Sequence, residues 1–242
     1  MNKDTVYTAN QPLFFPHIYM MNRYANVGNF VAMNNAQFTK FGHQSRVELL
    51  DKHGNERLVI IPLKNRSFKA INEVELDNPI KAITKFMKTL KTLYGSAPHF
   101  VDVFSFVEET MATAPVHEGV TLAEFNNRIL HSLFMWLELP VKWYDSDVIV
   151  PVRSDAPSEW VAQMGAAINC TLYVGGGTAQ NAYIKEEDFS SRGMSFVAQD
   201  FKLEGYTRFK GAVATRATVS ILDPLFWVGK DATLDIITKE AY

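Results

Sequence analysis

Residues 5–33 carry the pattern that most constrains the fold, because strand-like and helix-like segments follow one another within them. Residues 5–9 form a short β-rich run that ends before Pro12, where proline removes a donor from any strand ladder. Pro16 is well placed to open a helix, whose apolar residues recur at helical spacing. Residues 30–33 form a second apolar run. A strand, a helix and a strand within about 30 residues are the size of a βαβ unit, so we expect the first two strands to be parallel.

The whole chain is expected to be an α/β protein, with a mixed, mostly parallel sheet flanked by helices. A helical insert is expected around residues 80–138, because Asn78-Pro79 starts one amphipathic run and Thr121 with Glu124 forms a capping box before another. No clear linker or internal repeat interrupts the sequence, so we expect a single domain over residues 1–242. The other expected elements are a hairpin over 44–51 and 57–64, strands over 141–144, 147–152, 171–174 and 194–200, and helices over 158–167, 183–192, 220–228 and 231–239.

Composition and charge exclude several classes of protein. The formal net charge is -2 and the basic residues are dispersed, so the chain lacks the charged face that non-specific nucleic-acid binding requires. Cys170 is the single cysteine, so no internal disulfide can form. The N-terminus lacks the apolar segment of a signal peptide, and no apolar run approaches the roughly 20 residues of a membrane-spanning helix. We therefore expect a cytoplasmic protein without a membrane span, and leave a homodimer open.

Polar side chains follow the first two expected strands, at the edge where parallel strands end. Gln11 follows the first strand, and Gln37 and Lys40 follow the second. Ligands of open α/β sheets bind at this carboxyl edge, so we expect a pocket here. Lys40 and Arg46 would bind an anionic group, and Gln11 and Gln37 would recognise hydroxyls or amides. A polar turn that bonds to its own backbone is the alternative for the amides, and a solvated surface is the alternative for the two cations.

A glycine cluster marks a second candidate region. Gly175, Gly176 and Gly177 follow an apolar strand and continue into Thr178-Ala179. Glycines let a ligand come close to the backbone, whose N–H groups can bind an oxyanion or a phosphate. A plain tight turn is the alternative.

Two further side chains are candidates for chemistry. Asp223 lies in an apolar run and needs a helix N-terminus or a cation as its partner; in a site it would orient a cation or act as a base. Cys170 would be the nucleophile of an acyl transfer, but no histidine lies near it in the sequence, and a small core residue is the alternative. The chain has no zinc-ligand spacing, P-loop, GxSxG or HExxH motif, so no metal site is predicted and the cofactor is unknown.

The order of these motifs resembles the WbqC-like protein family over nearly the whole chain. The resemblance rests on Gln11-Pro12 to Pro16, Gln37 to Lys40 with Arg46, Tyr94 to Phe100, Tyr173 to Gly176 with Tyr183, and Ser220 to Gly229. It implies a role in O-antigen or related surface-polysaccharide biosynthesis, and a transferase of acyl or aminoacyl groups. The family usually has histidine where this chain has Asn10, and acidic residues where it has Asn29, Asn34 and Asn35.

Three functional hypotheses follow. The first is a transferase acting on a nucleotide-linked sugar or a nucleotide, with a phage-type enzyme of nucleotide or DNA base modification as a variant. The second is a non-catalytic binding or accessory protein with the same pocket, which the asparagine replacements favour because amides bind without moving protons. The third is a nucleotidyltransferase in which His17 contacts phosphate. The candidate catalytic residues are Asn10, Lys40 and Asp223, and the candidate substrate-binding residues are Gln11, Gln37, Arg46, Tyr173, Gly175, Gly176 and Tyr183.

Overall fold

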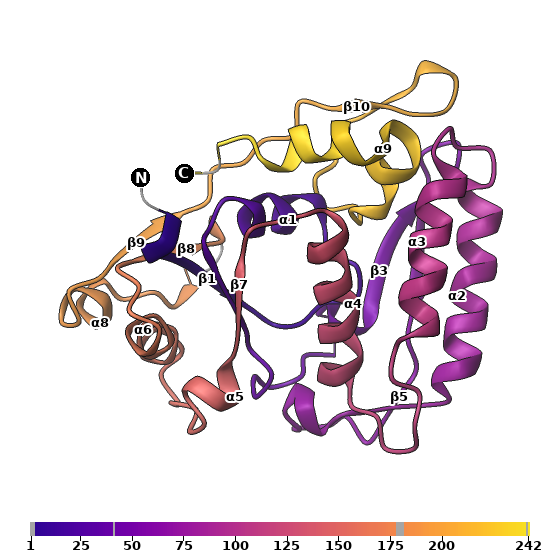
Figure 1. Ribbon diagram of the computed structural model, residues 1–242. Coiled ribbons are helices and arrows are strands. Elements are labelled where there is room, and N and C mark those ends of the chain that lie inside the picture. Colours follow the sequence, from indigo (N-terminus) through magenta and orange to yellow (C-terminus); the bar gives the residue numbers. More distant parts are fainter. Residues whose placement is uncertain (1–2, 41, 178–181, 241) are drawn as a thin grey trace.

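A five-stranded parallel sheet forms the centre of the protein in the computed structural model, which describes residues 3–40, 42–177, 182–240 and 242 (Figure 1). Every neighbouring pair of strands in this sheet is parallel. The two central strands are buried on both faces, as is usual in parallel sheets. The strands are, in spatial order, β7 (Lys142–Asp145), β2 (Asn29–Ala32), β1 (Val6–Asn10), β8 (Leu172–Gly175) and β9 (Ser195–Ala198). Helix α1 (Ile18–Ala25) joins β1 to β2, which confirms the predicted βαβ unit.

The direction of the chain across the sheet reverses between β1 and β8. From β1 the chain proceeds outward to β2 and then to β7, and it returns to the other side of β1 to form β8 and β9. Across this boundary Val6 pairs with Leu172, and Tyr7 pairs with Tyr173. In doubly wound sheets the loops that follow two such strands diverge, and ligands bind in the crevice between them. The topology therefore places a binding crevice at the carboxyl ends of β1 and β8.

Three helices between β6 (Glu75–Leu76) and β7 form the predicted helical insert (Figure 1). The Asn78 side chain caps the first of them by accepting a hydrogen bond from the Lys81 N–H at 3.2 Å. Thr121 and Glu124 form the predicted capping box of the third. One continuous cluster of buried apolar residues includes the insert and the sheet, which supports our proposal of a single domain. The helices are α2 (Pro79–Tyr94), α3 (Phe100–Ala112) and α4 (Leu122–Trp136).

Short antiparallel pairs and helices surround the central sheet. The predicted hairpin is confirmed as the antiparallel pair β3 (Arg46–Leu50) and β4 (Glu56–Ile60). No helix among the described residues has the length and apolar character needed to cross a membrane. The remaining strands are β5 (Leu63–Lys64), which pairs with β6, and β10 (Tyr206–Thr207), which pairs with β11 (Val213–Ala214). The remaining helices of the described residues are α5 (Ser146–Ile149), α6 (Pro157–Ala167), α8 (Glu186–Ser190) and α9 (Leu222–Ile237), with short 3₁₀ helices at Lys3–Thr5, His43–Ser45, Ile71–Glu73 and Phe209–Gly211.

Three elements differ from those expected. The strand predicted over 147–152 is wrong, because the chain enters helix α5 directly after β7. A short apolar run does not by itself distinguish a strand from a helix. The helix predicted over 183–192 is shorter in the structure and consists of α8. The two predicted terminal helices are joined in α9, which is broken at Gly229, where a φ of 83° interrupts the helical backbone.

Asp223 fixes α9 to the rest of the protein through a buried ion pair. Its carboxylate is fully buried and accepts hydrogen bonds from Arg208, at 2.8 Å from Nε and 2.9 Å from Nη2. The Tyr94 hydroxyl donates to it at 2.9 Å, and the Tyr206 hydroxyl also donates to it. Arg208 Nη2 reaches the Leu50 carbonyl at 3.3 Å. Residues of α2 and β10 and Arg208 thus meet at one carboxylate of α9, and Arg208 also contacts β3. Of the two partners expected for Asp223, the cation is present.

Replacing Asp223 with asparagine should destabilise the fold severely, because Arg208 would retain a buried charge without its counter-ion. We expect a loss of about 3–5 kcal/mol in the free energy of unfolding, measured by urea denaturation. Glu138→Gln is the matched control, since Glu138 pairs with Lys230 at 2.6 Å but is 80% exposed. That variant should unfold at nearly the wild-type urea concentration. An Asp223→Asn protein as stable as the wild type would contradict this structural role.

Candidate functional site

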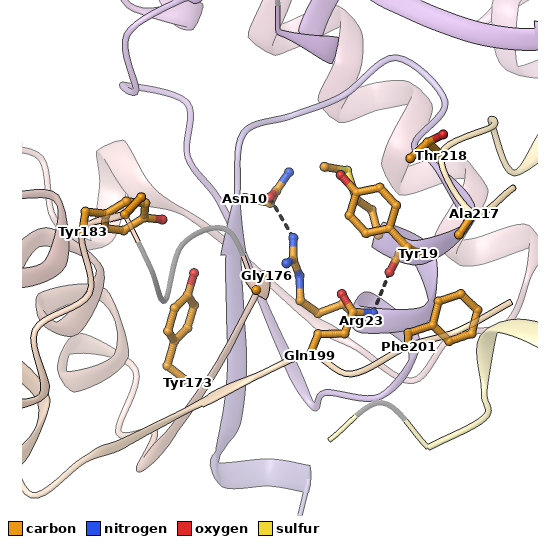
Figure 2. Close-up of a pocket in the computed structure, with 13 residues that line it drawn as sticks. Asn10, Tyr19, Arg23, Tyr173, Gly176, Tyr183, Gln199, Phe201, Ala217 and Thr218 are labelled. Carbon is orange, nitrogen blue, oxygen red and sulfur yellow. Dashed lines mark hydrogen bonds between the residues drawn. The ribbon is translucent and has the colours of Figure 1, made fainter.

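A pocket of about 620 Å³ lies at the carboxyl ends of β1 and β8, where the topology predicts a binding crevice (Figure 2). Asn10, the last residue of β1, and Gly176, directly after β8, lie at its base. Helix α1 forms one wall, and the segment that follows β9 contributes Gln199 and Phe201. The pocket therefore draws on both sides of the point where the chain reverses.

Arg23 is the charged side chain of this pocket. The residue is only 4% exposed, and its Nη2 donates to Asn10 Oδ1 at 3.1 Å. Among the described residues no carboxylate forms an ion pair with it. A Cβ on Gly176 would lie 2.8 Å from Arg23 Nη1, so glycine at this position makes room for the guanidinium. Because a buried cation is costly without a counter-ion, this geometry is typical of a site whose ligand supplies the negative charge.

Aromatic side chains surround the guanidinium. Tyr19 comes from α1, Tyr173 from β8, and Tyr183 from the segment before α8 (Figure 2). Burial raises the pKa of all three tyrosines, and the charge of Arg23 opposes that rise. Their hydroxyls therefore stay protonated at neutral pH, where they can donate and accept hydrogen bonds but do not act as bases. Aromatic walls beside a cation suit a ligand that combines an anionic group with a ring.

Gly175 lies next to the pocket and packs closely against neighbouring residues. Its carbonyl accepts a hydrogen bond from the Gln199 N–H at 2.8 Å, and a Cβ there would meet the Phe196 ring at 2.7 Å. Thr178 and Ala179, the end of the glycine stretch, lie outside the described residues. Substrate binding by the glycine turn stays a prediction. The predicted site residues that do line the pocket are Asn10, Tyr173, Gly176 and Tyr183.

The other polar residues expected at this edge do not line the pocket. Gln11 Nε2 donates to the Gln37 carbonyl at 3.4 Å, so these two segments lie side by side at the expected edge of the sheet. Lys40 is exposed, and Arg46 is half-buried at the start of β3. Ligand binding by these four residues stays a prediction.

Three candidate reactive side chains are buried outside the pocket lining. Asp223 is enclosed by its ion pair, and a catalytic role for it stays a prediction. Cys170 precedes β8 and so lies at the amino end of the sheet, opposite the pocket. Burial raises the pKa of the Cys170 thiol to about 11, which disfavours the thiolate that acyl transfer needs. His17 is 3% exposed, and with His43 and Glu48 it forms the group of potential metal ligands found in the part of the chain that the structure describes.

Arg23 and Gln199 line the pocket without being predicted by the sequence motifs. A basic residue on a short helix is ordinarily solvated, so its position in the sequence does not indicate that Arg23 is buried. One sequence signal does point to it, because Arg23 is the only Asp, Glu, Lys or Arg between Asp4 and Lys40. Gln199 Nε2 donates to the Tyr19 carbonyl at 2.7 Å and thereby joins the loop after β9 to α1 (Figure 2). That contact depends on tertiary structure, and no sequence pattern predicts it.

Comparison with protein families matches the WbqC-like protein family over residues 11–235 of the 242-residue chain. The matched segment begins directly after Asn10 and contains α1, β2, β7, β8, β9 and the other residues of the pocket. Comparison with curated proteins gives no match. Because the family match extends over most of the sequence, the chain belongs to the WbqC-like protein family.

Proposed function

We propose that the pocket binds the anionic part of a nucleotide or a nucleotide-linked sugar, and that the protein transfers an acyl or aminoacyl group to that ligand. The observation that carries the proposal is Arg23, a buried guanidinium that faces the pocket and has no carboxylate partner in the part of the chain that the structure describes. A guanidinium binds phosphate through two parallel hydrogen bonds, which makes phosphate a fitting counter-ion. We further propose, from the family resemblance, that the reaction belongs to surface-polysaccharide biosynthesis in the cytoplasm.

The walls of the pocket support a ligand with a ring attached to its anionic group. Tyr19, Tyr173, Tyr183 and Phe201 offer aromatic surface, on which a sugar or a base can pack. The volume of about 620 Å³ is within the range of roughly 300–1,000 Å³ that small-molecule sites have. A nucleotide-linked sugar presents both chemical features, whereas inorganic phosphate presents only the charge.

A non-catalytic binding or accessory role is the second candidate, and the chemistry of the lining favours it. The described residues that line the pocket include no carboxylate, histidine or cysteine. Burial raises the pKa of the lining tyrosines, so none of them is a base near neutral pH. A transferase would therefore need a proton acceptor from the co-substrate or from a neighbouring group.

Mass spectrometry separates the two roles once a ligand is known. The protein would be incubated with the bound nucleotide sugar and with acyl and aminoacyl donors. A mass increase on the sugar supports transfer, and a ligand that binds but is recovered unchanged with every donor supports the accessory role. If no nucleotide or nucleotide sugar raises the melting temperature, both versions of this function are contradicted.

Replacing Arg23 with glutamine should weaken binding of the anionic ligand. Loss of one charge-assisted hydrogen bond removes about 1.5–3 kcal/mol, which corresponds to roughly tenfold to hundredfold weaker affinity in calorimetry. Arg57→Gln is the matched control, since that arginine is largely exposed in the β3–β4 hairpin. Asn10→Asp should weaken binding as well, because it places a competing carboxylate 3.1 Å from the guanidinium while retaining Arg23. Wild-type affinity in both the Arg23→Gln and the Asn10→Asp variants would rule out this site.

Gly176→Ala and Gly177→Ala form a second matched pair within the same pocket. A Cβ on Gly176 would lie 2.8 Å from Arg23 Nη1, whereas a Cβ on Gly177 would meet none of the described residues within 4 Å. The flexible guanidinium can move, so we expect the first variant to remain folded but to bind the ligand several-fold more weakly. The second should bind normally. Equal affinities for the two variants, measured by calorimetry, would show that the position of the guanidinium does not matter.

A further inference from the structure

A second group of polar side chains lies beside the pocket and is not part of its lining. It consists of His17 at the N-terminus of α1, His43 in the 3₁₀ helix, and Glu48 in β3. One potential ligand atom from each of the three lies within 4.8 Å of the other two. Ser220 sets their spacing through the backbone, because it forms a β-bridge with His17 and donates its N–H to the Glu48 carbonyl at 2.8 Å.

His17 is buried without the hydrogen bonds that an imidazole normally makes. It is 3% exposed, and neither of its ring nitrogens has a hydrogen-bond partner in the described part of the chain. His43 Nδ1 lacks one as well, and the two rings meet edge to face with centroids 4.2 Å apart. A neutral imidazole has one donor and one acceptor, and leaving either group buried without a partner destabilises the fold. A bound ion that takes up the nitrogen lone pairs would remove part of this penalty.

We propose that His17, His43 and Glu48 bind a first-row transition-metal ion, with Zn²⁺ as the best fit, and that one coordination position stays open to water. Two imidazoles and one carboxylate are a ligand set that zinc uses where three protein ligands leave a fourth position open. Magnesium and calcium prefer sites made of oxygen ligands, so the two histidines disfavour them. The three ligands come from three separate elements, which is why no ligand spacing is visible in the sequence.

The ligand atoms, which lie within 4.8 Å of one another, must move closer together to bind the ion. Zinc bonds of about 2.0–2.1 Å in tetrahedral geometry place the ligand atoms roughly 3.3–3.4 Å from one another. His43 Nδ1 already lies 3.9 Å from Glu48 Oε1. Both side chains are partly exposed, 36% for His43 and 21% for Glu48, so they can turn toward the buried His17.

Arg216 is the cation that faces this group, and it also orients Glu48. Its Nη2 lies 3.4 Å from Glu48 Oε2, and its Nη1 contacts the Glu56 carboxylate. Glu48 and Glu56 thus contribute two carboxylates, and Arg216 contributes one guanidinium. The group is therefore negative overall when both histidines are neutral. Because Arg216 holds Oε2, Oε1 remains directed at His43. A partner that holds a ligand from behind in this way is a common feature of metal sites.

The proposed metal site adjoins the pocket but does not depend on it. Arg216 Nε donates to Thr218 Oγ1 at 2.7 Å, and Thr218 lines the pocket (Figure 2). Metal binding can therefore be measured without any nucleotide, and Arg23 contributes nothing to it. A failure of one proposal leaves the other intact.

Metal titration of the full chain tests the proposal. The protein, without an affinity tag, would be treated with EDTA, desalted and titrated with Zn²⁺ in a calorimeter and with Co²⁺ in a spectrophotometer. We expect one ion per chain, and a visible Co²⁺ absorption typical of a tetrahedral or five-coordinate site. His43→Ala and Glu48→Gln should each lower the affinity at least about tenfold, since each removes one of three ligands.

His53→Ala and His117→Ala are matched controls, because both histidines are exposed and lie outside the group. They should bind one ion with wild-type affinity. For His17→Gln the melting temperature would be measured together with the affinity, because that side chain is in the core and its replacement can destabilise the fold. Absence of stoichiometric binding to the wild type would overturn the proposal. Unchanged affinity in both the His43→Ala and the Glu48→Gln variants would overturn it equally.

Discussion

The pairing of β1 with β8 is the interaction on which the rest of the structure depends. These strands lie far apart in the sequence, and they pair in register at Val6 with Leu172 and at Tyr7 with Tyr173. The pairing places β1 in the middle of the sheet and forces the chain to reverse direction there. The loops after the two strands then diverge, which opens the pocket and brings Asn10 near Gly176. A different neighbour for β1 would leave the same βαβ unit without this site.

Two buried arginines show how the same side chain can serve stability or binding. Arg208 and Arg23 are 5% and 4% exposed, so burial does not distinguish them. Arg208 has a carboxylate at 2.8 Å and two backbone carbonyls within reach, and its charge is satisfied inside the protein. Among the described residues, Arg23 has one hydrogen-bond partner, the neutral amide of Asn10, and it faces a cavity. The missing counter-ion, rather than the presence of a cation, is therefore what marks a binding site.

Local patterns in the sequence predicted those parts of the fold that local interactions determine. The first βαβ unit, the hairpin, the helical insert and the Thr121 capping box are all encoded within short segments, and the structure confirms them. The strand expected over 147–152 is wrong because its short apolar run fits a helix as well. Local patterns also predicted only part of the candidate site, because distant segments of the chain meet there. Local motifs identify Asn10, Tyr173, Gly176 and Tyr183 as candidate site residues. The contact between their loops, and the burial of Arg23 between them, follow from long-range strand pairing, which no local pattern contains.

The pocket and the histidine group each supply what the other lacks. The pocket offers a cation and aromatic walls, but no side chain among the described lining residues is a base near neutral pH. A zinc ion lowers the pKa of a bound water to about 7, so a metal held by His17, His43 and Glu48 would supply a base at neutral pH, and Arg216 connects this group to Thr218 in the pocket lining. An anion site without a metal site would fit the accessory role. Both sites together would fit a transferase, in which Arg23 would bind the ligand and a hydroxide on the metal, formed from the bound water, would accept the proton.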